Sequence, residues 1–213
     1  MAYRTVCISP TDGSGGEFVG PMVAEALGFQ LLNTQIVTRT AEEAGVDPAA
    51  VVDAEGRQSL AARLLGRLTD AGPSGAAGFT SHAAAVEDPG PDREALRDFI
   101  RAIIWEAGER GDAVIVTHAA SYALASRSDV LRVLISASPE TRARRIAEAK
   151  GCSESDAAKA VARGDAGRAD YLKRFYDIDS ELPTHYDIVI DTDRLDPVAA
   201  AELIVGAARS QPD

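Results

Sequence analysis

The chain has few of the features of exported, membrane-spanning or disulfide-built proteins. Its 213 residues include two cysteines, Cys7 and Cys152, which are too few for a disulfide scaffold. No apolar run reaches the roughly 18 residues that a membrane helix needs. The first residues also lack the basic and apolar regions of a signal peptide. We therefore expect reduced thiols, a cytoplasmic location and no membrane partner.

Basic residues are also fewer than acidic ones. The chain has 22 Lys and Arg against 33 Asp and Glu, a net charge of −11, which disfavours binding to nucleic acid or anionic lipid. The exception is the segment 132–174, in which basic residues outnumber acidic ones. This local excess indicates either a small anionic ligand or a solvated pair of Arg-rich helices.

Hydrophobic periodicity predicts an alternation of strands and helices. Short apolar or β-branched runs predict strands at residues 5–9, 29–32, 113–117, 130–136 and 187–191. Helical spacing predicts helices at residues 18–27, 41–54, 57–68, 93–109, 139–150, from 153 onward and at 196–209. This order predicts an α/β fold with a mostly parallel sheet, in which ligands bind beyond the carboxyl ends of the strands.

A cluster of glycines follows the first predicted strand directly. Gly13, Ser14, Gly15 and Gly16 lie between this strand and the first predicted helix. Glycines allow backbone N–H groups to converge on an anion, and a helix N-terminus adds its dipole. The cluster therefore predicts a phosphate-binding loop, and the alternative is a flexible turn.

The loop departs from the standard phosphate-binding pattern, G-x-x-x-x-G-K-[ST]. Pro10, Gly16 and Glu17 stand where that pattern has Gly, Lys and Ser or Thr, so the loop has no lysine for the phosphates and no hydroxyl for Mg²⁺. Pro21 leaves two alternatives open. The helix passes through Pro21 with a local disturbance, or it begins there and leaves the glycine amides away from its tip.

Two stretches of the sequence carry further motifs. Residues 4–32 have a G-S-G-G loop without lysine, and residues 113–192 contain LRVLISASPETRARRIAEAKGCSESDA, DAGRADYLKRFY and YDIVIDT. Over these stretches the sequence resembles the cytidylate-kinase-like proteins, and much less over residues 40–95. The resemblance implies a P-loop-kinase-like, three-layer α/β sandwich with a five-stranded sheet. It also implies a single domain over residues 1–213, with a variable insertion at 40–92 and a helical lid at 151–178.

The resemblance also implies roles for four arginines. Arg142 and Arg145 would lie at the base of the lid, and Arg163 and Arg168 in the lid itself. In phosphoryl transfer, guanidinium groups neutralise the charge that spreads over the phosphoryl oxygens. The alternative is that these arginines only form ion pairs with nearby carboxylates.

Two further positions are expected to face the substrate. Asn33 follows the second predicted strand, where the family tends to have Asp. His118 follows the third, where the family tends to have Gly-Arg. Each difference removes a charged group. No metal centre is expected, because the three histidines have no ligand spacing with one another or with the cysteines.

Two functions remain open from the sequence. One is the ATP- and Mg²⁺-dependent phosphorylation of a pyrimidine nucleoside monophosphate, with CMP as the first choice. The other is a non-catalytic relative with a degenerate loop that binds a nucleotide, a protein partner or a second copy of itself. The lid arginines favour the kinase, whereas the missing lysine and Glu17 favour the non-catalytic relative.

Overall fold

The computed structural model describes residues 3–33, 36, 65–66 and 91–210, with side chains of the 91–110 helix described from residue 98 onward. Five strands form one sheet in the order β2-β3-β1-β4-β5, and all four strand pairings are parallel. The strands are β1 Thr5–Pro10, β2 Gln30–Asn33, β3 Ala113–Val116, β4 Val130–Ser136 and β5 Ile188–Asp191. The predicted α/β fold with a five-stranded parallel sheet is confirmed.

The described helices agree with most of the predicted ones. They are α1 Gly16–Leu27, α4 Pro91–Arg110, α5 Ala120–Ala123, α6 Pro139–Lys150, α7 Glu154–Tyr176, α8 Pro197–Arg209 and the short 3-10 helix η3 Pro183–His185. Of the predicted helix 57–68, only residues 65–66 are described, and they are helical. The predicted helix 41–54 and nearly all of the insertion 40–92 lie outside the described residues.

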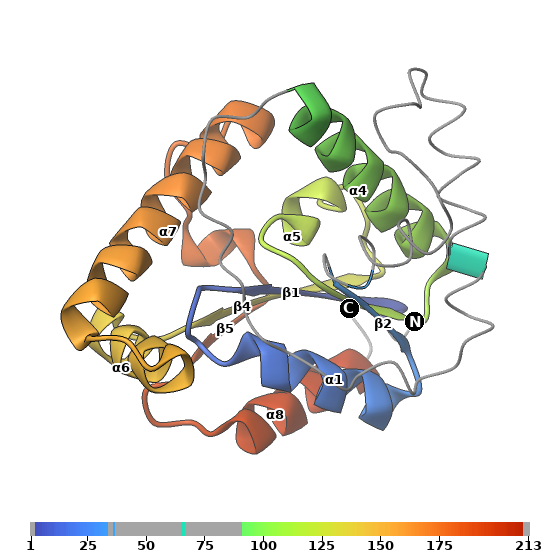
Figure 1. Cartoon of the computed structure of the whole chain (residues 1–213). Helices are drawn as coiled ribbons and strands as arrows, with labels where there is room; N and C mark the ends of the chain where they lie inside the picture. The colour runs from blue at the N-terminus through green and yellow to red at the C-terminus, as the bar shows by residue number, and fades with distance from the viewer. Residues whose placement is uncertain (1–2, 34–35, 37–64, 67–90, 211–213) are drawn as a thin grey trace.

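Helices cover both faces of the sheet and form three layers (Figure 1). On one face, α1 and α8 pack on inward side chains such as Val6, Ile8 and Val114. On the other face, α4 and α5 pack on Cys7 and Ile115. Neighbouring residues of one strand thus point to opposite faces of the sheet, and both faces are covered by helices. For this reason the strand sequences are continuously apolar instead of alternating between apolar and polar residues.

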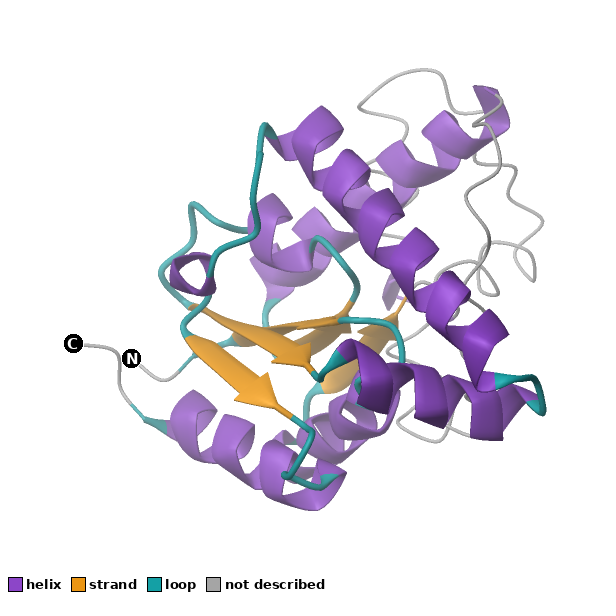
Figure 2. Ribbon diagram, turned by 90° about the vertical axis from the view of Figure 1, so that its left-hand side faces the viewer, coloured by secondary structure: helices purple, strands orange, loops and turns teal. Residues whose placement is uncertain are grey.

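The helices α6 and α7 lie together beyond the carboxyl end of β1 (Figures 1 and 2). Their starts are those that the sequence predicts. Pro139 occupies the first turn of α6, and the Ser153 side chain accepts a hydrogen bond from the Asp156 N–H at the start of α7. A small apolar cluster that includes Ile146 and Val161 holds the two helices to each other.

The alternatives left open by Pro21 are resolved by the extent of α1. The helix runs from Gly16 to Leu27 with Pro21 inside it, so the glycine loop lies directly at its N-terminus. Pro21 removes one backbone donor from the helix interior. The loop retains the position that an anion-binding loop requires.

Candidate active site

The glycine loop has a defined backbone conformation. Gly13 and Gly15 adopt left-handed conformations, with φ of 78° and 84°, which side-chain-bearing residues rarely adopt. Between them, the Ser14 N–H donates to the Thr11 carbonyl at 3.0 Å. A Cβ at Gly16 would lie 2.3 Å from Cβ of Pro10, so only glycine fits against that ring.

The first amides of α1 are available to a ligand. Gly15 is the N-cap, and it supplies no side chain to satisfy them. Its carbonyl accepts from the N–H groups of Phe18 and Val19, the first donors with a helical partner. The N–H groups of Gly16 and Glu17 precede them and have no acceptor within the helix, so they form an anion-binding end.

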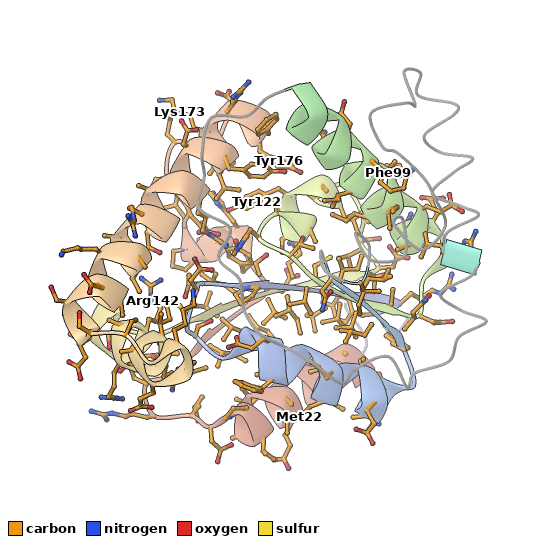
Figure 3. The ribbon with its side chains drawn as sticks, viewed as in Figure 1. Met22, Phe99, Tyr122, Arg142, Lys173 and Tyr176 are labelled. Atoms are coloured by element: carbon orange, nitrogen blue, oxygen red, sulfur yellow. The ribbon has the colours of Figure 1, made fainter. Side chains whose placement is uncertain are left out.

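Arg142 and Arg145 lie against the carbonyl side of the glycine loop. Arg142 Nη1 is 3.4 Å from the Asp12 carbonyl oxygen, and Arg145 Nη1 is 3.4 Å from that of Gly13. Arg142 lies on α6 (Figure 3), is buried, and forms a two-pronged ion pair with Asp165 of α7 at 2.8 and 2.5 Å. In this conformation both guanidinium groups support the loop backbone.

Arg168 lies at the opposite side of the site. Its side chain is 8% exposed, and its Nη1 donates to the Pro10 carbonyl at 3.2 Å. Two further nitrogens donate to the Glu181 carboxylate at 2.7 and 2.6 Å, and the Tyr186 hydroxyl donates to the same carboxylate. Burial alone would raise the pKa of Glu181, but the hydrogen bonds and charge of Arg168 outweigh it and lower that pKa.

His118 joins this cluster from the end of β3. His118 Nδ1 lies 3.0 Å from Arg168 Nη1 and 3.2 Å from the Pro10 carbonyl oxygen, so it contacts both a donor and an acceptor. Desolvation beside α7, and then the positive charge of Arg168, lower the pKa of His118. The other ring nitrogen, Nε2, lies 3.9 Å from Asp12 Oδ1.

The structure brings together most, but not all, of the predicted site residues. The glycine loop, Arg142, Arg145, Arg168 and His118 form one connected cluster. Arg163 is exposed on α7, and none of the described residues forms an ion pair with it. Asn33 is buried at the end of β2, where its Oδ1 accepts from the Ile36 N–H at 2.8 Å and closes a turn.

The structure also adds residues that the sequence analysis missed. Glu181 and Tyr186 hold Arg168, and Thr192 holds the glycine loop from the end of β5. One sequence feature could have marked Thr192 as a site residue: it follows the last strand at the carboxyl edge of the sheet, where ligands are expected. No sequence feature marks Glu181, because it lies outside every recognisable helix, strand or motif.

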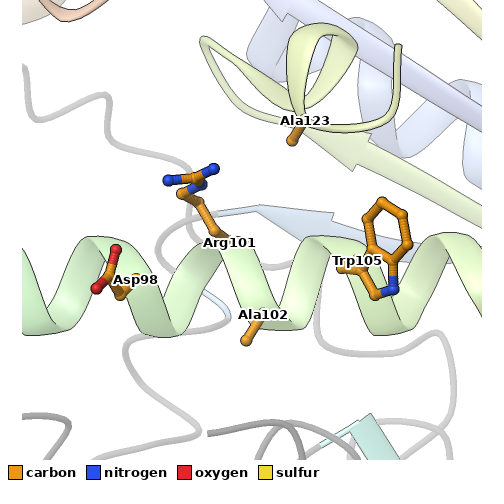
Figure 4. A pocket seen from close by; sticks show the side chains of 5 residues that line it. All are labelled: Asp98, Arg101, Ala102, Trp105 and Ala123. Carbon is orange, nitrogen blue, oxygen red and sulfur yellow. The ribbon is translucent and has the colours of Figure 1, made fainter. Parts of the chain in front are cut away.

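A hollow of about 280 Å³ opens between α4 and α5, away from the residues of this cluster (Figure 4). Its lining consists of Asp98, Arg101, Ala102, Trp105 and Ala123. Trp105 is 43% exposed, and the Arg101 guanidinium lies 5.6 Å from the centre of the Tyr176 ring. No predicted site residue lines this hollow.

Fold and loop together define a P-loop-kinase-like α/β protein. A solved but uncharacterized protein from Eubacterium ventriosum has the same fold, with 17% identity, a TM-score of 0.66 and coverage of 98% of this chain and 99% of that one. Shikimate kinase from Bacteroides thetaiotaomicron is similar at 14% identity, with a TM-score of 0.50 and 96% coverage of each chain.

The chain belongs to the Cytidylate kinase-like family, whose model matches residues 5–194. A curated relative, the cytidylate kinase of Pyrobaculum aerophilum, is 27% identical over 191 residues, covering 89% of this chain and 84% of the relative. The resemblance drawn from the sequence is therefore confirmed. Family and fold support a nucleotide-kinase-like function. Within the described part of the chain, no helix is both long and apolar enough to cross a membrane.

Proposed function

We propose that this protein transfers the γ-phosphoryl group of ATP to a pyrimidine nucleoside monophosphate, with CMP as the first choice. The observation that carries the proposal is the glycine loop. Its free amides lie at the tip of α1, with a buried arginine at its carbonyl side and another at Pro10. The cytidylate kinase among its relatives supports CMP as the acceptor.

Each group in the site has a role in this proposal. The amides of Gly15, Gly16 and Glu17 would hold phosphate oxygens, and Arg168 would neutralise charge that develops on the transferred group. Arg142 and Arg145 would hold the loop in its phosphate-binding shape, and Arg163 would reach the site only after α7 moves. Residues 151–178, which contain α7, form the proposed lid, and residues 40–92 the proposed insertion in a single domain.

The described residues form no Mg²⁺ site that is built from protein side chains alone. Among the described residues, no cluster of three or more His, Cys, Asp or Glu is arranged to hold a metal. Glu17 also stands where a standard loop has its metal-binding hydroxyl. The cation would therefore enter bound to the triphosphate, and we assign it no protein ligand.

A second candidate function is a non-catalytic relative that binds a nucleotide or a protein partner. The observation that favours it is the pairing of two arginines, Arg142 with Asp165 and Arg168 with Glu181. A phosphate must compete with these carboxylates for the same donors. The missing lysine and the negative charge of Glu17 further weaken the site for a triphosphate.

Calorimetric titration with ATP and with CMP, each with and without Mg²⁺, distinguishes the two functions. The kinase proposal expects ATP to bind with a dissociation constant of roughly micromolar order, with ADP formed when CMP is added. ATP binding without turnover over a panel of nucleoside monophosphates would support the non-catalytic relative. Absence of binding for both nucleotides at millimolar concentration would overturn both nucleotide proposals.

A further inference from the structure

We infer that Thr192 is a positioning residue of the phosphate site, which sets the direction of the Gly15 N–H through the carbonyl of Ser14. The inference rests on the proposed function, because it assumes that the loop binds a phosphate. Thr192 follows β5, is 3% exposed, and comes from a part of the chain 178 residues away from Ser14. Its Oγ1 lies 2.8 Å from the Ser14 carbonyl oxygen.

The surrounding hydrogen bonds assign the hydroxyl proton of Thr192. Arg145 Nη1 donates to Thr192 Oγ1 at 3.1 Å and so occupies one of its lone pairs. The Ser136 carbonyl lies farther from this oxygen, at 3.1 Å, and it also accepts from the Thr192 N–H at 2.8 Å. The proton is therefore directed to the nearer acceptor, the Ser14 carbonyl.

This contact determines the orientation of the peptide that joins Ser14 to Gly15. In a trans peptide, the C=O and the following N–H point in opposite directions. With the Ser14 carbonyl turned toward Thr192, the Gly15 N–H points to the other side of the loop. It thereby joins the free amides of Gly16 and Glu17 at the start of α1.

The loop itself does not enforce this orientation. A flip of the peptide mainly changes ψ of Ser14 and φ of Gly15, and glycine adopts either sign of φ at little cost. The flipped state would aim a carbonyl oxygen at the anion and withdraw one donor. A buried hydroxyl behind the loop selects the donating state before any ligand arrives.

Arg145 supports the same arrangement from α6. Its Nη2 donates to the Thr192 carbonyl at 2.7 Å, and its Nη1 faces the Gly13 carbonyl as well as Thr192 Oγ1. One guanidinium group thus holds both the loop and the residue that positions the loop. Thr192 remains the better test, because replacing Arg145 would also remove the contact with the Gly13 carbonyl.

The test compares Thr192→Val, which keeps the shape and removes the hydroxyl, with Thr192→Ser, which keeps the hydroxyl. Titrations with ATP and with CMP are run on the full chain, together with thermal melts. We expect Thr192→Val to raise the Kd for ATP by about 5- to 10-fold, the loss of roughly one hydrogen bond. The Kd for CMP should change less than about 2-fold, and Thr192→Ser should restore ATP binding.

The outcomes separate this inference from the proposed function. Equal ATP affinity in wild type and Thr192→Val overturns the positioning role and leaves the proposed function standing. Equal weakening of ATP and CMP, with no recovery in Thr192→Ser, also overturns it, because that result marks a general structural defect. If wild type binds neither ATP nor inorganic triphosphate, the proposed function fails and the inference fails with it.

A second variant covers the case in which Thr192→Val does not fold. Thr192→Ala also lacks the hydroxyl, but it introduces no methyl group against the Ser14 and Ser136 carbonyls. The same selective loss of ATP affinity is expected from it. ATP binding equal to that of wild type in a folded Thr192→Ala variant would overturn the inference.

Discussion

At the scale of single residues, Arg168 connects more parts of the site than any other side chain described above. It contacts the Pro10 carbonyl at the start of the glycine loop, His118 at the end of β3 and Glu181 before η3. From this position Arg168 could contact a phosphate bound in the loop. It could also serve only as a structural ion pair with Glu181, so the two roles need separate measurements.

We predict that Arg168→Ala lowers turnover by at least about 100-fold, the effect typical of losing one charged transition-state donor. The measurement is a coupled assay of ADP release with CMP as acceptor. Arg144→Ala is the matched control, because Arg144 is an exposed arginine on α6 outside the cluster. Arg168→Ala with turnover within 2-fold of wild type, as in the control, would exclude the catalytic role.

Stability must be followed in the same variant. Removing Arg168 leaves the Glu181 carboxylate, 19% exposed, without its cation, which is costly for a buried pair. The double variant Arg168→Ala/Glu181→Gln removes that unpaired charge and should recover part of the lost melting temperature. It should not recover turnover, and recovery of both would show that Arg168 acts on folding alone.

Gly16 provides a second prediction at this scale. The Cβ of Gly16→Ala would lie 2.3 Å from Pro10 Cβ, a rigid ring that cannot turn away. We expect a loss of about 1–3 kcal/mol in the free energy of unfolding, measured by chemical denaturation, together with weaker ATP binding. The control Gly206→Ala lies in α8 with open space at its Cβ and should stabilise the protein by about 0.5–1 kcal/mol. Equal effects of the two substitutions would contradict this account.

At the scale of elements, helix starts determine how the sheet faces are covered. The α8 helix begins with Asp196, whose Oδ1 accepts from the Ala199 N–H at 2.8 Å, followed by Pro197 in the first turn. Its buried residues, such as Ile204, complete the core that α8 shares with α1. A weaker start therefore reduces the packing of a whole layer.

We predict that Asp196→Ala lowers the free energy of unfolding by about 1 kcal/mol, because the Ala199 N–H loses its acceptor. Urea denaturation monitored by circular dichroism measures the change. Asp196→Asn preserves an acceptor at the same position and should cost much less. A similar loss in both variants would show that the charge of Asp196, rather than its capping hydrogen bond, stabilises α8.

At the scale of the whole molecule, ion pairs join segments that are distant in the sequence. Arg132 of β4 holds Asp187 before β5, and Arg168 of α7 holds Glu181. For both carboxylates burial would raise the pKa, but the arginine partner outweighs it and lowers the pKa. The folded protein therefore holds these two protons less tightly than the unfolded chain does.

This difference predicts that the protein loses stability in acid. The contribution of both pairs is fully present above about pH 5, beyond the unfolded pKa values near 4, and it is lost as the pH falls through the folded values. Melting temperatures between pH 7 and pH 3 measure the decline. Glu181→Gln should flatten it, whereas an unchanged decline in that variant would show that other groups are responsible.

The sequence predicted those parts of the site that depend on local pattern. A buried strand followed by glycines and an apolar helix specifies the loop at Gly13–Gly16, because neighbours in sequence create both the turn and the helix tip. The starts of α6 and α7 were predicted for the same reason, from Pro139 and Ser153. The roles of Arg142, Arg145, Arg163 and Arg168 in turnover stay predictions.

The partners of the site residues could not be predicted in this way. The bond from Thr192 to Ser14 spans 178 residues, and the contact of Arg168 with Pro10 spans 158. The Asn33 side chain accepts a hydrogen bond within a local turn that the sequence did not predict, and its contact with substrate stays a prediction.

The amino-acid sequence by itself determined the strand and helix order, the α/β class, the family and the place of the loop. The order, the class and the loop follow from hydrophobic periodicity or from short motifs that act within a few residues, and the family follows from the resemblance of longer stretches of sequence. Only the tertiary structure decided which carbonyl each guanidinium faces, and that Thr192 lies behind the loop. Those contacts exist because a parallel sheet gathers the carboxyl ends of all its strands at one edge, whatever their separation along the chain.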